Sequence, residues 1–368
     1  MTGTAPISQT PPFEGPGFNR LLVDLAGRAD EDDRQGEWPQ WQFERLAESG
    51  VLGWVIPPEY GGTGINAEAL VCGYERLATA CLTTAFIMTQ RNGACQRIAA
   101  SGHDELKAEL LPELGCGRLF ATVGVSHLTT SRQHLRRPAV QVAAAGDDLV
   151  LSGLIPWVTG GKSADYVVTG GAFDDGRQIL IALPIRLPGV TMHEPVPLMA
   201  LDASQTGSIE LSNVRVHRRF LLAGPVAGVM QQGQGGGTGS VATSALAVGL
   251  AGRSLAHLMQ ESDRRPDLNA VIEPFAAEWT ALRQDLYAAA RGEAAPHKPH
   301  LSNESIRGRA NALALRLTQA LLAVSKGAGY VKGHPAERGV REAMFFLVWS
   351  CPQPLVTAAL RQFACLAD

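Results

Sequence analysis

The sequence lacks the cysteine patterns of a metal site or a disulfide framework. Its six cysteines are scattered over 368 residues, and no Cys-x-x-Cys pair or Cys/His cluster occurs. Spacings of that kind identify zinc sites and disulfide scaffolds. We therefore expect free thiols, no bound metal, and a reducing compartment such as the cytoplasm.

A strong charge of one sign is also missing, and so is a long hydrophobic run. The formal net charge is −3, which gives no reason to expect nucleic acid or a membrane surface as a partner. No uncharged apolar run long enough to cross a bilayer is found, so no transmembrane helix is predicted. Residues 1–17 are rich in Pro, Thr and Gly and are expected to form a flexible N-terminus rather than a signal peptide.

What is present is a change of pattern along the chain. Residues 18–117 carry long runs without proline that are typical of helices, among them 67–78 and 82–99. Residues 118–222 carry short runs rich in Val, Ile, Leu and Thr, at the spacing of an antiparallel barrel or sandwich. Residues 223–368 return to apolar stripes at three- and four-residue steps. The predicted fold is α+β and multidomain: an N-terminal α-helical domain, a middle antiparallel β domain and a C-terminal four-helix bundle.

The stretch from residue 120 to residue 161 stands out within the middle region. Its two ends are predicted strands, and Gly146-Asp147-Asp148 predicts a hairpin turn between them. Trp157 and Thr159 are two residues apart, so on a strand they share a face. A flat ring beside a hydroxyl suits an aromatic heterocycle such as a flavin. From these residues alone, a core tryptophan followed by a turn is the simpler interpretation.

Several motifs, taken in order, resemble those of the acyl-CoA dehydrogenase family. Residues 46–64 are similar to the family's first signature, and residues 157–161 (Trp-Val-Thr-Gly-Gly) to its Trp-Ile-Thr-Asn-Gly. Residues 327–330 and 335–338 are similar to its C-terminal Gly-Gly-Tyr-Gly-Tyr and Pro-Val-Glu-Arg motifs. The resemblance covers about residues 40–350. It implies a subunit of three domains, usually in a homodimer or homotetramer.

The resemblance also implies a flavin, either FAD or FMN, between the middle domain and the C-terminal bundle. In that arrangement Thr159 approaches the flavin N5 atom and Trp157 approaches the ring edge, with Val158 between them. Ser126, preceded by Val125, takes the place of the threonine that serves the flavin pyrimidine.

Three further residues are expected at the substrate. His134 lies in a basic loop that would hold the phosphate of CoA or of a carrier protein, although a solvated loop is the simpler interpretation. Trp349 stands at the position of the family's tyrosine. Gly239 stands at the position where a minority of the family places its catalytic glutamate.

The resemblance fails at the residues that carry the family's chemistry. That chemistry removes an α-proton from an acyl thioester and needs a carboxylate base. Alignment on residues 335–338 puts Ser350 at the main base position, and Gly239 stands at the alternative one. Neither residue is a carboxylate. The family's Arg-x-x-x-Phe-Gly segment, which holds the FAD pyrophosphate, has no counterpart. Weak or borrowed flavin binding is therefore expected.

Three functions stay open from the sequence. The first is a flavin-dependent oxidoreductase acting on an acyl thioester or a related small substrate, with an electron-transfer partner and another base such as His127 or Glu342. The second is a flavin-dependent monooxygenase that takes reduced flavin from a partner reductase, with His127, His134 and Ser350 near the flavin. The third is a redox-inactive member with a non-redox or scaffold role. His127 and Ser350 are the candidate catalytic residues.

Overall fold

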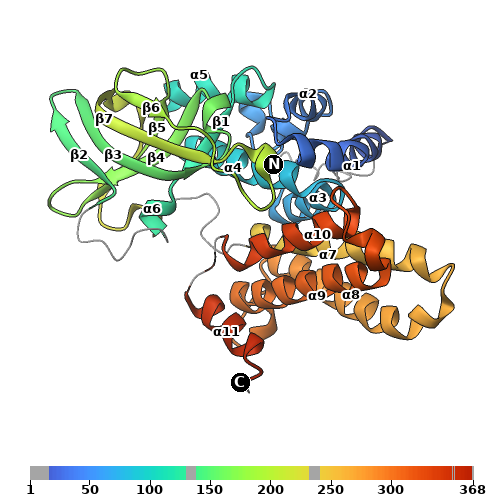
Figure 1. Ribbon diagram of the computed structural model, residues 1–368. Helices are drawn as coiled ribbons and strands as arrows, with labels where there is room; N and C mark the ends of the chain where they lie inside the picture. Colours follow the sequence, from blue (N-terminus) through green and yellow to red (C-terminus); the bar gives the residue numbers. More distant parts are fainter. Residues whose placement is uncertain (1–15, 130–137, 232–240, 350, 352, 367–368) are drawn as a thin grey trace, which may run out of the picture.

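The computed structural model describes residues 16–129, 138–231, 241–349, 351 and 353–366. Along these residues the chain forms helices, then a sheet, then helices again (Figure 1). The sheet lies beside the N-terminal helices, and the C-terminal helices pack beneath them in that view. The predicted order of helical, β and helical regions is confirmed.

The N-terminal helices enclose one side of the molecule's centre. They are α1 (Pro16–Gln35), α2 (Gln40–Glu48), α3 (Ala67–Ala80), α4 (Leu82–Ala99) and α5 (Asp104–Gly115). The predicted helix at residues 82–99 has the bounds of α4. Most of the α4 side chains are buried, because the helix lies between the sheet and the other helices.

The middle region is a mostly antiparallel sheet, as predicted. Its strands are β1 (Ala121–Gly124), β2 (Val140–Ala145), β3 (Asp148–Val158), β4 (Tyr166–Ala172), β5 (Gln178–Pro184), β6 (Val190–Met192), β7 (Gly207–His217) and β8 (Leu221–Val226). Their order is β6-β7-β3-β2-β4-β5-β8, and β1 pairs with β4. In β2 and β3, Ala145 pairs with Asp148. Gly146 and Asp147 therefore form the predicted hairpin turn.

The first strand departs from the sequence expectation in two ways. β1 runs parallel to β4, with Ala121 opposite Tyr166, because β1 enters the sheet from a helix rather than through a hairpin. The predicted strand also ends early, at Gly124. Residues 126–129 form the short helix α6 (Ser126–Thr129) instead.

The C-terminal helices form the third region. They are α7 (Val241–Ser262), α8 (Asn269–Ala290), α9 (Asn303–Gly329), α10 (Pro335–Met344) and α11 (Gln353–Phe363). Short 3₁₀ helices connect elements along the chain, at Val51–Gly53, Pro58–Tyr60, Gly161–Ser163, Asp202–Ser204, Arg218–Phe220, Val229–Gln231, Pro266–Leu268, Pro299–Leu301 and Phe345–Leu347.

Helix α7 is the central helix where the two helical regions meet. It has the length and hydropathy of a membrane span, but 67% of its most apolar window is buried inside the protein. Its backbone lies directly on α3 at Gly249, where an added Cβ would come within 2.4 Å of the Glu75 carbonyl oxygen. Only glycine allows the two helices to approach this closely.

Buried ion pairs fix α10 to its neighbours. Glu342 on α10 pairs with Arg253 of α7, and both side chains are less than a tenth exposed. Arg338 on the same helix lies 3.1 Å from Asp30 of α1. Breaking such a buried pair leaves a charge without compensation, so these contacts determine where α10 lies.

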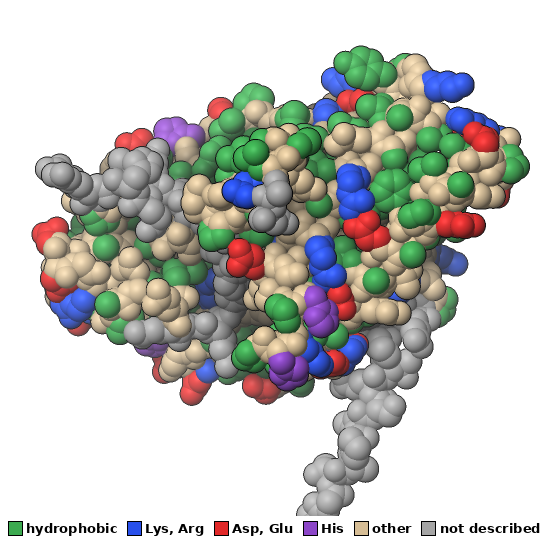
Figure 2. Space-filling model, turned by 90° about the horizontal axis from the view of Figure 1, so that it is seen from below, with side chains coloured by type: hydrophobic (Ala, Val, Ile, Leu, Met, Phe, Trp, Pro, Cys, Tyr) green, Lys and Arg blue, Asp and Glu red, His purple; other side chains and the backbone are tan. Residues whose placement is uncertain are grey.

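The surface over the C-terminal helices is mixed in character. Figure 2 views the molecule from this side, with acidic and basic side chains interspersed among hydrophobic ones. This pattern agrees with the small net charge of the chain. The six cysteines are free thiols.

Candidate functional site

A cavity of about 1010 Å³ lies where the three regions meet. Its walls come from α3, α4, β1, α6, the end of β3, the segment around residues 198–206, the start of α7, and the residues from α10 to Trp349. Most of the lining is apolar. A large apolar cavity with a few polar groups is the usual form of a ligand site.

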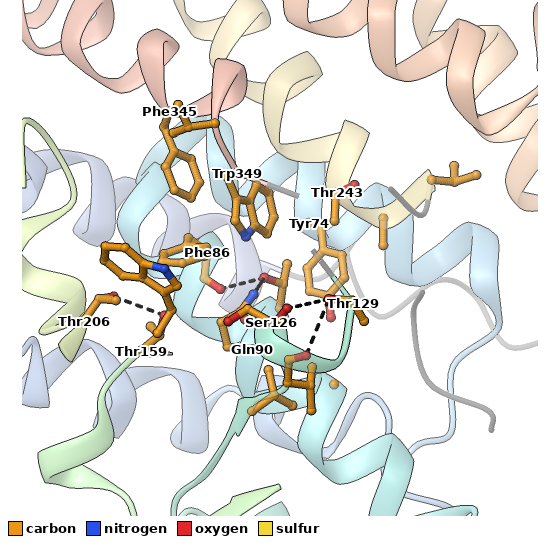
Figure 3. Close-up of a pocket in the computed structure, with 18 of the residues that line it drawn as sticks. Tyr74, Phe86, Gln90, Ser126, Thr129, Thr159, Thr206, Thr243, Phe345 and Trp349 are labelled. Carbon is orange, nitrogen blue, oxygen red and sulfur yellow. Dashed lines mark hydrogen bonds between the residues drawn. The ribbon is translucent and has the colours of Figure 1, made fainter. Parts of the chain in front are cut away.

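The sheet side of the cavity holds four of the predicted cofactor residues. They are Val125, Ser126, Trp157 and Thr159. Trp157 is 48% exposed, so its ring lies at the cavity mouth rather than in the core. The Thr159 hydroxyl lies 3.2 Å from that of Thr206, and Figure 3 shows the two side chains together on one side of the cavity.

The Thr206 hydroxyl has a second partner deeper in the protein. It lies 2.8 Å from the hydroxyl of Ser204, which is fully buried. Thr159 and Thr206 are themselves less than a tenth exposed. Three linked hydroxyls therefore fix the rotamer of Thr159 while its side chain stays in the cavity wall.

Ser126 presents a hydroxyl that is available for a ligand. Its Oγ atom is buried and makes no hydrogen bond to the residues that the structure describes. The backbone around it is held by Thr129, whose hydroxyl donates to the Ser126 carbonyl oxygen at 3.3 Å. Buried polar atoms are nearly always paired, so this hydroxyl fits a polar group of a bound molecule.

The opposite wall is aromatic. Phe345 and Trp349 stack with ring centroids 5.0 Å apart. Phe86 of α4 meets their edges at 4.9 Å and 5.2 Å, and Figure 3 shows the three rings grouped on one side of the cavity. Edge-to-face contacts of this kind favour a fixed arrangement, so the wall presents a rigid apolar surface.

Arg307 of α9 supports this wall from behind. The side chain is fully buried, and its Nη2 atom donates to the Trp349 carbonyl oxygen at 2.8 Å. The guanidinium also lies 5.3 Å from the centre of the Trp349 ring. Burial lowers the pKa of Arg307. Trp349 is therefore held by its backbone and its ring together.

The charged groups in the lining are arginines. The described lining residues include no Asp, Glu, His, Lys or Cys. Arg341 has close carboxylate partners, since it lies 2.6 Å from Asp33 and 2.5 Å from Glu337. These carboxylates raise the pKa of Arg341. Arg97 is 8% exposed and donates to the neutral Gly93 carbonyl oxygen at 2.8 Å.

Tyr74 lines the rear of the cavity but is not placed for acid or base chemistry near neutral pH. Its hydroxyl is buried and accepts a hydrogen bond from Asn92 at 2.9 Å. Burial raises the pKa of Tyr74 well above its ordinary value. The phenol therefore stays neutral.

The other predicted residues lie elsewhere. His127 is buried behind the cavity wall, with its Nε2 atom 2.9 Å from the Gly170 carbonyl oxygen of β4. The side chain of Val158 faces the core of the sheet, because it alternates with Trp157 along β3. Glu342, the alternative base, lies in the buried ion pair with Arg253.

Of the remaining predicted residues, one lies in the cavity wall and three cannot be placed. Trp349 lines the cavity, as expected of a residue at the substrate. His134, Gly239 and Ser350 lie outside the described residues.

Several lining residues were not predicted from the sequence. Phe86, Gln90, Gly93 and Arg97 follow one another at steps of three and four along α4, so they share one face of the helix. The available signal was the helical spacing of these four residues, but polar residues such as Arg91 and Asn92 also occur on other faces of α4, so the spacing alone did not single out the site. Thr206 lies within the range of the family resemblance but in none of the motifs named for it, and nothing local marked its contact with Thr159.

Comparison with known proteins agrees with this architecture. Residues 23–118 match the family model described as the acyl-CoA dehydrogenase N-terminal domain. The probable acyl-CoA dehydrogenase YngJ of Bacillus subtilis (strain 168) is 27% identical over 340 residues, which cover 87% of this chain and 88% of YngJ. Butyryl-CoA dehydrogenase from Megasphaera elsdenii superposes with a TM-score of 0.78, at 19% identity over 100% of both chains. This protein has the acyl-CoA dehydrogenase fold. The resemblance predicted from the sequence motifs is confirmed.

The acyl-CoA dehydrogenase fold also occurs in a solved structure with a different ligand. KijD3, in complex with FMN and a dTDP-linked sugar, superposes with a TM-score of 0.76 at 19% identity, over 99% of this chain and 96% of KijD3. Proteins of this fold thus include enzymes named for acyl-CoA substrates and a protein that binds a nucleotide sugar.

Proposed function

We propose that this protein is a flavin-dependent oxidoreductase that acts on an acyl thioester or a related small substrate. The observation that carries the proposal is that one cavity has a wall with hydroxyl groups and, opposite it, an aromatic wall. Hydroxyls of Ser126 and Thr159 line one side, and the stacked rings of Phe345 and Trp349 line the other. A flat heterocycle with a polar edge and an apolar substrate together match these surfaces.

The residues on the sheet side fit a flavin. The Ser126 hydroxyl is buried without a partner among the described residues, so it would bond a polar edge of the ring. Thr159 offers a second hydroxyl of fixed rotamer, and Trp157 offers an indole at the cavity mouth. A bound flavin would supply two-electron redox chemistry, as acceptor of substrate electrons or, once reduced by a partner, as donor to O₂.

The cavity lining favours a second candidate function, monooxygenation. Removal of an α-proton needs an acceptor, and the described lining residues include no carboxylate or imidazole. The hydroxyls of Ser126 and Thr159 do not accept a proton at neutral pH. A monooxygenase supplied with reduced flavin by a partner reductase needs no carboxylate base. The likeness in fold to KijD3, whose structure holds FMN, supports a flavin in either candidate.

The experiment that tests the proposal is a flavin titration. The purified protein is mixed with oxidised FAD or FMN, desalted and examined by visible absorption, and the titration is repeated anaerobically with reduced flavin. Binding of either form supports the proposal. A protein that binds neither form contradicts both candidates and leaves the redox-inactive interpretation.

Turnover then separates the two candidates. Anaerobic bleaching of the bound flavin by acyl thioesters indicates dehydrogenation. Product that forms only with a flavin reductase and O₂ indicates monooxygenation.

A further inference from the structure

A group of polar side chains lies behind the aromatic wall of the cavity and holds its backbone. Arg307 of α9 donates to the Trp349 carbonyl oxygen at 2.8 Å. One turn further along α9, Asn311 donates to the Phe346 carbonyl oxygen at 2.9 Å. The Cys351 thiol donates to the same oxygen at 3.1 Å. The position of the aromatic wall therefore depends on this thiol as well as on α9.

This group offers more hydrogen bonds than it makes. Arg307 is fully buried, and its Nε and Nη1 atoms have no hydrogen-bond partner among the described residues. The Oδ1 atom of Asn311 is also buried and has none there. Buried donors of this kind are nearly always paired, so the guanidinium fits a further acceptor beside it.

The charge of Arg307 is not balanced by a carboxylate in the part of the chain that the structure describes. Its acidic neighbour there is the thiol of Cys351. Burial lowers the pKa of Arg307, and the interaction with Cys351 opposes this effect. An arginine close to a cysteine favours the thiolate, which is the nucleophilic form of the side chain. The guanidinium thus supports a reactive sulfur at Cys351.

Cys351 also meets the requirement of access. Its side chain is partly exposed, whereas Cys81 and Cys95 are buried. Its sulfur donates to a carbonyl oxygen only as a thiol, because a thiolate or a disulfide sulfur carries no proton. A reaction at this sulfur therefore removes one of the contacts that hold the Phe346 carbonyl group.

We propose that Cys351 is a site of reversible modification by a small disulfide, and that the modification loosens the aromatic wall of the cavity. The thiol releases its proton to water, and its sulfur attacks one sulfur of the disulfide. A new S–S bond forms and the old one breaks, so Cys351 is oxidised and the departing sulfur leaves as a thiolate. An excess of thiol reverses the reaction. The proposal does not depend on which ligand the cavity binds.

The first test compares two thiols of the same chain. The purified protein is incubated with oxidised glutathione, and the rate at each cysteine is measured by peptide mass spectrometry. Cys116 is exposed and also has an arginine neighbour, but the charge of Arg118 is balanced by Glu113 at 2.5 Å. We expect Cys351 to react about tenfold faster than Cys116, although it is less exposed. An equal or slower rate at Cys351 overturns the proposal.

The second test removes the charge behind the wall. Arg307→Gln should lower the rate at Cys351 about tenfold and leave the rate at Cys116 unchanged. Arg307→Lys keeps a positive charge and should retain most of the rate. Circular dichroism confirms that each variant is folded, and the comparison of the two thiols in the wild type stands without either variant. A folded Arg307→Gln protein that reacts at the wild-type rate contradicts the proposal.

The third test follows the wall itself. Modification should change the tryptophan fluorescence, because Trp349 belongs to the segment that the thiol holds. Dithiothreitol should reverse the change. Trp349→Phe should lose most of it, and Cys351→Ser should show none while Cys116 still reacts. Modified Cys351 without a change in fluorescence, or with a change that persists in Trp349→Phe, overturns the effect on the wall.

Discussion

The two walls of the cavity differ in what they keep of the acyl-CoA dehydrogenase pattern. The sheet wall keeps the Trp-Val-Thr motif and a hydroxyl at Ser126. On the opposite, aromatic wall, the sequence resemblance predicts that Trp349 replaces the family's tyrosine and that the serine after it replaces the catalytic glutamate. These walls come from segments far apart in the chain. Under the proposed function, the residues for the flavin and those for proton transfer would lie on different walls, so one set could change without the other.

The largest expected effect comes from removing the buried ion pair that holds α10, the helix before the aromatic wall. Glu342→Gln should lower the free energy of unfolding by about 3–5 kcal/mol, because Arg253 is left buried without its counter-charge. Urea denaturation followed by circular dichroism measures the change. Glu278→Gln removes an exposed partner of Arg316 and should cost about 1 kcal/mol or less. Equal losses in the two variants would show that the buried pair does not anchor α10.

The next effect isolates the sheet wall. Ser126→Ala should weaken flavin binding about five- to tenfold, because the ligand loses one buried hydrogen bond. Phe86→Leu, on the aromatic wall, should leave flavin affinity within about twofold. Quenching of flavin fluorescence measures both affinities. If Phe86→Leu weakens flavin binding as much as Ser126→Ala, the proposal that only the wall with Ser126 binds the flavin is wrong.

A smaller effect concerns the hydroxyls behind Thr159. Thr206→Val should lower the free energy of unfolding by about 1 kcal/mol, because Thr159 and the buried Ser204 both lose a partner. Thr206→Ser keeps the hydroxyl and should lose less. Thermal unfolding of the wild type, Thr206→Val and Thr206→Ser ranks their stabilities. A Val variant as stable as the wild type would show that these contacts do not stabilise the wall.

The smallest effect is a pH dependence near the buried ion pairs. Burial, and after it the charge of Arg253, lowers the pKa of His257 below its ordinary value. Below about pH 6.5 the unfolded chain then binds this proton more readily than the folded protein does, so stability falls as the pH falls through that value. His257→Gln should reduce the loss between about pH 7.5 and pH 5.5. An unchanged slope in denaturation midpoints would assign the dependence to other groups.

Much of the fold follows from local patterns in the sequence. The run of helix-compatible residues at 82–99 gives α4 its bounds, and Gly146 and Asp147 give the β2–β3 turn. The parallel pairing of β1 does not follow, because it depends on where α5 delivers the chain. Helix α6 is also hidden, since Ser126 to Thr129 directly follow an apolar run that is typical of a strand.

The site is less accessible to sequence reasoning than the fold. Trp157 and Thr159 are found because they are two apart on one strand. Thr206 meets Thr159 only through the pairing of β3 with β7, so their 47-residue separation hides the contact. Arg97 belongs to the site because Gly93, one turn earlier on α4, leaves room for its guanidinium. That relation is a property of packing rather than of a motif.

The close seat of α7 on α3 at Gly249 also bears on the shape of the cavity. Both helices contribute lining residues, among them Tyr74 and Thr243, although Gly249 itself lies outside the lining. No side chain at position 249 separates the two backbones, so a change of rotamer there cannot alter their spacing. The distance between the parts of the cavity wall that α3 and α7 carry is therefore a fixed dimension of the fold.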